Sequence, residues 1–244
     1  MKNSRKGGLL LLLLLLASFV GVVYIGTEMF QVKTIVVTGN QQVGYGEIVK
    51  MSGISLGQNI FKIDRAVIEE RIETNPYLDV LSVNFKYPDE VIINIKERTP
   101  AAVIPYLGSY IVINDEGYVL EIHRALDDIS YPLIQGLTLK GCSKGKMVAV
   151  VDSYQIKALR HILEELYKQE LQDVISEILM DDPNDIYMIS RKGTIIRLGQ
   201  AVELKDKLKW LRTPNFQQID NSNIKSILDI SVTSQAIFKP LVED

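Results

Sequence analysis

The chain has little of what most catalytic and metal sites are built from. Its 244 residues include one cysteine and two histidines. The single thiol, Cys142, excludes an internal disulfide and any Cys-x-x-Cys or zinc-finger pattern. His123 and His161 lie far apart in the sequence without a neighbouring cysteine or histidine, so we expect ordinary surface or boundary side chains rather than metal ligands.

An excess of positive charge is found in the first eight residues and not in the remainder of the chain. The formal net charge of the chain is −3, and the leader carries Lys2, Arg5 and Lys6 without an acidic residue. The remainder therefore has a net charge of −6, obtained by removing these three positive charges from the total. A negative exported part argues against a nucleic-acid or anionic-lipid partner for it.

Recognisable catalytic patterns are absent as well. No nucleophile with a base, metal-ligand set or phosphate-binding loop assembles at a known spacing. Asp181-Asp182 precede a proline and are read as turn formers, and Asp127-Asp128 as a cap or solvated loop. Cys142 lies in a glycine-containing loop without a visible base. We expect a protein that is not an enzyme and needs no cofactor.

The most apolar feature present is the uncharged run over residues 9–25, which contains eight consecutive leucines. As a helix it would rise about 26 Å, close to the roughly 30 Å hydrocarbon core of a bilayer, and Gly26 and Thr27 extend it cheaply. We expect a transmembrane helix over residues 9–27, preceded by a cytoplasmic tail over residues 1–8.

The charges that flank this run set its orientation. Basic residues before it and Glu28 after it place the N-terminus in the cytoplasm and the bulk of the chain outside. A cleaved signal peptide is the alternative, but such apolar regions span about 7–15 residues and end in a small-x-small site. This run is longer and ends in Val22-Val23-Tyr24-Ile25. We expect a single-pass protein of the plasma membrane.

Residues 30–98 predict a small α+β domain in the order strand, helix, helix, strand, strand. Asp64 can cap the second helix, and Leu81, Val83, Phe85 and Tyr87 would form the apolar face of the following strand. Two helices on one face of a three-stranded sheet would complete the domain. The expected elements span residues 32–38, 45–51, 65–74, 81–87 and 91–96.

Residues 99–240 predict a second, strand-rich domain with a mixed sheet and helices on a face. Amphipathic helices are expected over residues 153–169 and 204–211, the latter ending before Pro214, and residues 241–244 form a short tail. The expected strands span residues 102–104, 110–113, 118–120, 132–136, 175–180, 186–190, 194–198, 227–232 and 235–238.

Several short motifs, in this order, resemble the FtsQ/DivIB family of bacterial cell-division proteins. They are the Gly39-Asn40 turn, Gly57-Gln58-Asn59-Ile60-Phe61, Asn75-Pro76-Tyr77, Pro88, Glu97-Arg98-Thr99-Pro100-Ala101 and Pro132-Leu133-Ile134-Gln135-Gly136. The likeness is clearest over residues 9–102. It implies a POTRA domain over residues 30–98 and a β-type domain over residues 99–240. We expect the motif residues to support the fold, with Gly39 and Gly57 at positive φ and Phe61 in a core.

The resemblance also implies a binding site at the last strand. In the family, the small coiled-coil division proteins FtsB/DivIC and FtsL add a strand there, and a free sheet edge is a physical platform for this. The alternative is that Ile237 and Phe238 only complete the core while Lys239 and Pro240 guard the edge. The matching positions are Val232, Ser234, Gln235, Ala236, Ile237 and Phe238.

The function implied is a membrane-anchored scaffold of the divisome at the septum, which recruits partners that regulate septal wall synthesis. Two other functions remain open. A POTRA-type translocation or assembly chaperone would carry repeated POTRA units and a β-barrel, and neither pattern is found. A membrane-tethered cell-wall enzyme would need a catalytic set that the sequence does not display.

Overall fold

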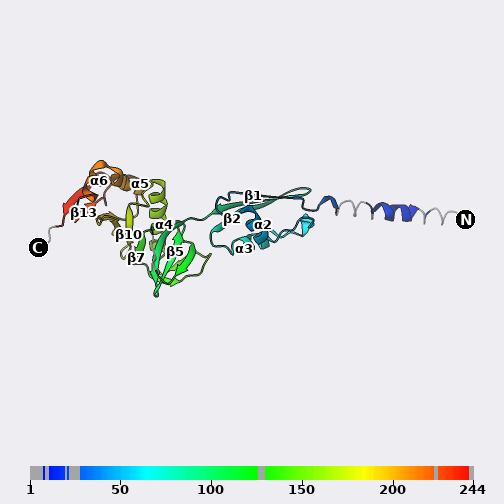
Figure 1. Cartoon of the computed structure of the whole chain (residues 1–244), viewed down its shortest axis with the longest axis horizontal. Helices are drawn as coiled ribbons and strands as arrows, with labels where there is room; N and C mark the ends of the chain where they lie inside the picture. Colours follow the sequence, from blue (N-terminus) through cyan, green and yellow to red (C-terminus); the bar gives the residue numbers. More distant parts are fainter. Residues whose placement is uncertain are drawn as a thin grey trace. The chain divides into compact units, whose positions relative to one another are not determined.

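The structure is a computed structural model that divides into two compact units, Met1–Glu97 and Arg98–Asp244 (Figure 1). Residues 1–7 of the expected cytoplasmic tail, much of the expected membrane span, the pair Asp127-Asp128 and residues 242–244 of the expected C-terminal tail lie outside the described residues. Within the part that is described, no helix is both long enough and apolar enough to cross a bilayer. The structure describes residues 8, 11–19, 21, 28–125, 130–222 and 225–241.

The first unit has the predicted order of elements. Its sheet runs β1-β3-β2, with β1 parallel to β3 and β2 antiparallel to it. Apolar residues of the two α-helices and the sheet share one core, which includes Ile48, Ile68 and Ile93. The elements are β1 (Thr34–Thr38), α2 (Tyr45–Ser52), η1 (Ile60–Lys62), α3 (Arg65–Ile72), β2 (Leu78–Lys86) and β3 (Glu90–Glu97).

Local chemistry fixes the ends of these elements. The Asp64 side chain accepts a hydrogen bond from the Ala66 N–H at 2.9 Å and caps α3, as predicted. The Glu97 carboxylate accepts the backbone N–H groups of Gln41, Gln42 and Val43 at 2.8–3.0 Å. Burial raises the pKa of Glu97, but these donors outweigh burial and lower the pKa below its ordinary value. Glu97 therefore ties the loop after β1 to the end of β3.

The predicted apolar face of β2 was wrong at two positions. Leu81 and Tyr87 are exposed, whereas Val83 is buried and Phe85 packs against the core. The register between β2 and β3 shifts by one residue between Val80 and Ser82. This shift is a β-bulge, after which the side chains that point to the core change from even-numbered to odd-numbered positions. Leu78 and Val80 therefore lie on the core side together with Val83.

The second unit is built on a nine-stranded mixed sheet in the order β14-β13-β12-β11-β10-β7-β4-β5-β6. Helices α4, α5 and α6 lie on one face of it (Figure 1), and their buried residues, such as Leu159, Leu208 and Phe216, join the sheet in one core. The strands before the last two are β4 (Pro100–Tyr106), β5 (Ser109–Asn114), β6 (Val119–His123), β7 (Leu133–Gln135), β10 (Ile175–Leu179), β11 (Ile186–Ser190) and β12 (Ile195–Gly199).

The helices differ from the predicted ones near Pro214. The expected helix over residues 204–211 is α5 (Leu204–Leu208) followed by the 3-10 turn η2 (Lys209–Arg212). Pro214 was predicted to end that segment, but it is also the first residue of a further helix, α6 (Pro214–Asp220). The side chain of Thr213 caps α6 by accepting a hydrogen bond from the Phe216 N–H. The remaining elements are α4 (Ser153–Lys168) and the small hairpin of β8 (Leu139–Gly141) with β9 (Ala149–Val150).

Candidate partner-binding edge

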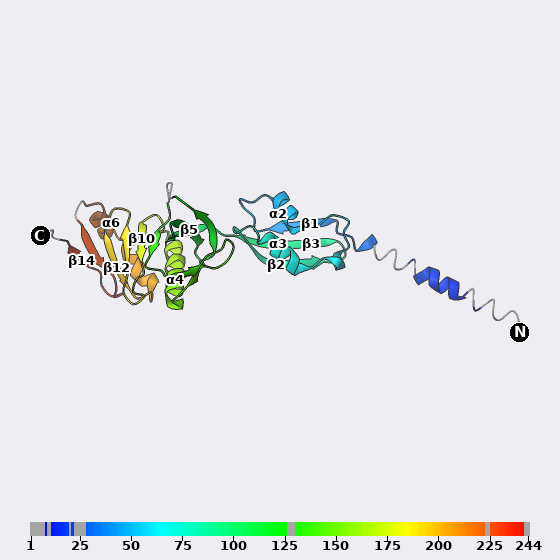
Figure 2. The same ribbon diagram turned by 90° about the horizontal axis from the view of Figure 1, so that it is seen from below.

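The last hairpin of the chain forms one end of the nine-stranded sheet. β13 (Ser226–Asp229) pairs parallel to β12, and β14 (Ile237–Pro240) pairs antiparallel to β13. Figure 2 shows β12 and β14 at this end of the unit. No strand of the described residues pairs with the other side of β14. The terminal strand is therefore an edge strand.

An apolar row crosses the sheet and ends at this edge. Its members are directly opposite one another on successive strands and so point to the same face. All but the last are buried, while Phe238 is 38% exposed. The last member of the row, on β14, is therefore only partly covered by the protein. From the middle of the sheet outward it consists of Ile134, Ile178, Met188, Ile196, Leu228 and Phe238.

The opposite face of the hairpin is held by an ion-pair network. Arg197 on β12 donates to the Asp185 carboxylate through Nε at 2.8 Å and Nη2 at 3.2 Å, and to Asp229 on β13 through Nη1 at 3.2 Å. Asp229 also accepts the backbone N–H and the hydroxyl of Ser231. Ile237 lies directly opposite Asp229 and is 41% exposed. The network fixes β13, on which β14 pairs.

These contacts also set the charge states of the network. Hydrogen bonds from Arg197 lower the pKa of the Asp185 carboxyl below its ordinary value. Burial raises the pKa of Asp229, but the bonds from Ser231 and Arg197 outweigh it and lower that pKa too. The two carboxylates raise the pKa of Arg197 in return. The network is therefore fully ionised at neutral pH.

The loop between β13 and β14 contacts the body of the unit at four positions. Ile230 is buried, and Ala236 packs against the core. The indole Nε1 of Trp210, on η2, donates to the Thr233 carbonyl at 3.4 Å. At the end of β12, Gly199 adopts positive φ where a Cβ would lie 2.9 Å from the Ser231 Cβ. The hairpin is thus positioned by packing from several elements.

The hydrogen-bonding pattern shows which backbone groups of β14 point away from the sheet. The Leu241 N–H donates to the Lys225 carbonyl at 2.8 Å, in continuation of the β13–β14 register. Because hydrogen-bonded and non-hydrogen-bonded pairs alternate in an antiparallel ladder, Ile237 and Lys239 face β13, while Phe238 and Pro240 face outward. Proline has no N–H, so the outer edge presents one donor, the Phe238 N–H, and the carbonyls of Phe238 and Pro240.

The structure separates the six predicted site residues into two groups. Ile237 and Phe238 lie on the edge strand, on its opposite faces. The predicted strands over residues 227–232 and 235–238 were too long and misplaced, because Asp229 closes a turn with Ser231 and the final strand continues through Pro240. The other four lie in the connecting loop, where Ala236 is half-buried and the rest are exposed: Val232, Ser234, Gln235 and Ala236.

Sequence reasoning missed Arg197 and Asp229, which hold the hairpin from behind. The available signal was a single charged residue in each of two otherwise apolar strands: Arg197 in Ile195–Gly199 and Asp229 in Ser226–Asp229. It also missed Leu241, which follows β14 and is exposed. Neither set is visible without the strand order, because Asp185, Arg197 and Asp229 belong to three separate segments.

The residues considered as catalytic or metal-ligand candidates lie in a turn, on the surface or against the core. Asp182 Oδ1 accepts the Asn184 N–H at 2.8 Å, which is a turn-forming bond. His123 contacts Glu121 on β6, and His161 is exposed on α4. Cys142 packs against the core as a free thiol. Over the described ranges, no group of three His, Cys, Asp or Glu side chains is arranged to hold a metal ion.

Comparisons with known proteins agree with the resemblance. The family described as "POTRA domain, FtsQ-type" matches residues 30–98. The cell division protein FtsQ of Syntrophotalea carbinolica is 28% identical over 226 residues, covering 91% of this chain and 78% of that protein. The cell division protein DivIB of Clostridium tetani is 25% identical and covers 73% of this chain and 67% of its own length.

One solved structure is also similar, that of the major extracytoplasmic domain of the trans isomer of the bacterial cell division protein DivIB from Geobacillus stearothermophilus. The match covers 53% of this chain and 99% of that one, at 15% identity and a TM-score of 0.34. The sequence relatives share the FtsQ or DivIB name and extend over both units of the fold. The chain carries an FtsQ-type POTRA domain over residues 30–98, and over most of its length it is similar to cell division proteins named FtsQ or DivIB.

Proposed function

We propose that the chain is a membrane-anchored scaffold of the division septum that binds small coiled-coil division proteins of the FtsB/DivIC and FtsL type through β14. By recruiting them it helps to control septal wall synthesis, and it performs no catalytic step itself. The observation that carries this proposal is the open edge of β14, where a completely buried apolar row ends in the partly exposed Phe238. A division role is supported by the names of the relatives.

Strand addition fits the geometry of this edge. An incoming strand would pair with the Phe238 N–H and the outward carbonyls, and its side chains would extend the apolar row beyond Phe238. Two further exposed side chains offer apolar contacts: Ile237 from the strand and Val232, which is 53% exposed, from the loop. Pro240 lacks a donor, so pairing centres on Phe238. The edge therefore provides both an attachment point and a register.

The anchor is the second part of the proposal. The apolar run over residues 9–27 would cross the plasma membrane, with Lys2, Arg5 and Lys6 in the cytoplasm and both units outside. This arrangement would place β14 where extracytoplasmic segments of other single-pass division proteins are accessible. It is supported by the length, the lack of charge and the basic flank of the run.

The test is co-purification of the full-length tagged chain from its native membrane, with the captured proteins identified by mass spectrometry. Phe238→Asp places a charge on the docking strand. Ile122→Asp is the matched control, because Ile122 lies on the opposite edge strand, β6, and is 37% exposed against 38% for Phe238. Circular dichroism verifies that both variants fold.

We expect the small coiled-coil division proteins to be captured by wild type and by Ile122→Asp. Phe238→Asp should reduce their affinity about 30-fold or more, because a central apolar anchor contributes on the order of 2 kcal/mol or more to an interface. Equal capture by all three chains would show that β14 is structural. Capture of secreted or outer-membrane chains in place of division proteins would favour a chaperone role.

A further inference from the structure

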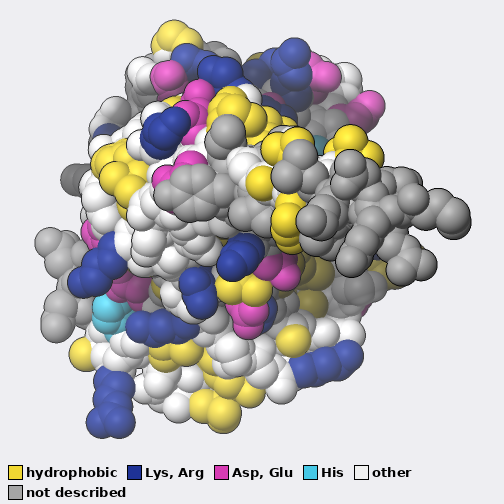
Figure 3. All heavy atoms as spheres, turned by 90° about the vertical axis from the view of Figure 1, so that its right-hand side faces the viewer, with side chains coloured by type: hydrophobic (Ala, Val, Ile, Leu, Met, Phe, Trp, Pro, Cys, Tyr) yellow, Lys and Arg dark blue, Asp and Glu magenta, His cyan; other side chains and the backbone are white. Residues whose placement is uncertain are grey.

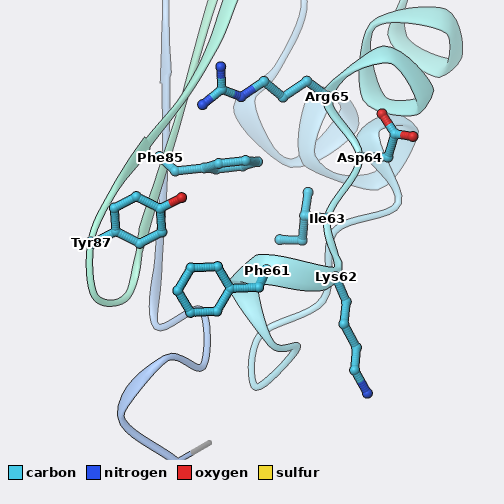
Figure 4. A pocket seen from close by; sticks show the side chains of 7 residues that line it. All are labelled: Phe61, Lys62, Ile63, Asp64, Arg65, Phe85 and Tyr87. Atoms are coloured by element: carbon cyan, nitrogen blue, oxygen red, sulfur yellow. The ribbon is translucent and has the colours of Figure 1, made fainter. Parts of the chain in front are cut away.

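The first unit carries an aromatic cluster in which Phe30 packs against the core while Phe61 and Tyr87 are exposed. Phe61 was predicted to fill a core, but it is 62% exposed, and Tyr87 is 54% exposed. The Phe61 and Tyr87 rings stack at 5.3 Å, and Phe30 lies 4.9 Å from Phe61. Figure 4 shows the Phe61 and Tyr87 rings beside each other, with Lys62 pointing away from them. Aromatic side chains grouped outside a core indicate contact with something other than water.

The cluster is joined rigidly to the chain that leaves the proposed membrane span. The Ile60 N–H donates to the Phe30 carbonyl at 2.9 Å, and the Val32 N–H to the Gln58 carbonyl at 2.9 Å. The Gly57 N–H donates to the Val32 carbonyl at 2.8 Å. Three backbone bonds therefore pair the segment before β1 with the segment that ends in Phe61, so Phe30 and Phe61 are held beside the point at which the chain enters the unit.

The chain between the span and the cluster is very short. Phe30 follows Thr27, the last residue of the proposed span, by three residues, which bridge at most about 11 Å. The headgroup layer on each side of the hydrocarbon core is about 5–8 Å thick. Phe30 and the two rings that contact it, Phe61 and Tyr87, are thus held within reach of that layer. Met29 and Leu56, both exposed, add apolar side chains from the same two segments.

We propose that the cluster of Phe30, Phe61 and Tyr87 inserts into the headgroup layer of the bilayer and holds the first unit in a fixed orientation on the membrane surface. Aromatic residues favour this layer because their rings are apolar while their edges tolerate water. The surface facing the viewer in Figure 3 carries hydrophobic side chains among charged side chains of both signs. A hollow beside the rings is lined by Phe61 and Tyr87 together with Lys62, Asp64 and Arg65. The Arg65 guanidinium lies 4.7 Å from the Phe85 ring, and the two cations of the hollow, against its one acid, can face lipid phosphates.

This inference rests on the membrane anchor proposed above, and the experiment separates the two. Full-length protein is reconstituted into phosphatidylcholine vesicles that contain brominated acyl chains, in a background where the single tryptophan, Trp210, is changed to Phe. One variant carries Phe61→Trp. The control carries Leu81→Trp, since Leu81 is also 62% exposed but lies six residues from Tyr87 along the same hairpin, about 20 Å away. Flotation measures anchoring, and bromine quenching measures contact with lipid.

We expect both variants to float with the vesicles and the quenched fraction of Phe61→Trp to exceed that of Leu81→Trp at least about twofold, because quenching requires a ring at bilayer depth. Equal quenching in protein that floats would overturn the insertion while leaving the anchor intact. Failure to float would overturn both. Shielding of Phe61→Trp from aqueous iodide only when division partners are added would assign the cluster to a protein contact and also overturn the proposal.

Discussion

The nine-stranded sheet ends in β6 on one side and in β14 on the other, and the two edges are finished differently. At β6, residues 145–148 run alongside the start of the strand: the Val119 N–H donates to the Lys146 carbonyl at 2.9 Å, and the Gly145 N–H to the Val119 carbonyl at 2.8 Å. At β14 no described segment takes this position, and only Lys239 and Pro240 restrict pairing. Edges are normally covered or charged to prevent unwanted pairing.

The difference teaches that exposure alone does not identify a binding edge. Ile122 on β6 and Phe238 on β14 are almost equally exposed. They differ in two respects. The backbone at the start of β6 is covered by residues 145–148, whereas the outer backbone of β14 is open. In addition, the buried apolar row of the sheet leads directly to Phe238. The comparison predicts that changes at β14 affect partner binding and that equivalent changes at β6 affect stability alone.

The largest effect should come from the core residues behind the two edges. Leu228→Ala on β13 and Leu120→Ala on β6 each remove a buried leucine and should each lower the free energy of unfolding by about 2–5 kcal/mol in urea titrations. Only Leu228→Ala should weaken partner binding, because Leu228 supports Phe238 directly. Equal binding losses in the two variants would mean that global stability, and not the β14 edge, governs binding.

A smaller effect should follow from the backbone donor of Phe238. Phe238→Ala and Phe238→Pro both remove the ring, but only proline removes the outward N–H. Because this N–H takes no part in the β13–β14 ladder, the two variants should have similar free energies of unfolding. In a partner titration, Phe238→Pro should bind about fivefold more weakly than Phe238→Ala, the value of one hydrogen bond. Identical affinities would indicate docking through side chains without strand pairing.

The smallest effect should be a dependence of the β14 edge on acid. The pKa values of Asp185 and Asp229 are lowered in the fold, so their stabilisation is complete above the unfolded value of about 4 and is lost as pH falls through the lower folded values. Partner binding should therefore stay constant from neutral pH to about pH 4 and weaken below it. Arg197→Met should remove most of this dependence, which binding titrations at several pH values would detect.

Much of the fold follows from sequence patterns that act locally. The alternation of Val91, Ile93 and Ile95 and the Asp64 cap were confirmed because each depends on neighbouring residues alone. Leu81 was wrong because a single bulge inverts the alternation, and a bulge leaves no mark on residue type. Pro214 was read only as a helix end because the same residue is favoured both after a helix and at the first position of the next.

The candidate sites depend on long-range order that the sequence does not display. Whether Phe238 completes a core or borders an open edge depends on β14 lying last in the sheet. The support from Arg197 requires Asp185 and Asp229 to be brought together from separate segments. Phe61 was expected in a core on account of its ring, but η1 turns it outward toward Phe30 and Tyr87.

The most direct test of the β14 edge is hydrogen exchange of single backbone amides, measured by NMR with and without the extracytoplasmic segment of a coiled-coil partner. In the free chain the amides of Ile237 and Lys239 should be protected by β13, and that of Phe238 should exchange rapidly. Partner binding should protect Phe238 and leave the other two unchanged. A bound partner that leaves the Phe238 amide exchanging at its free rate would contradict strand addition at β14.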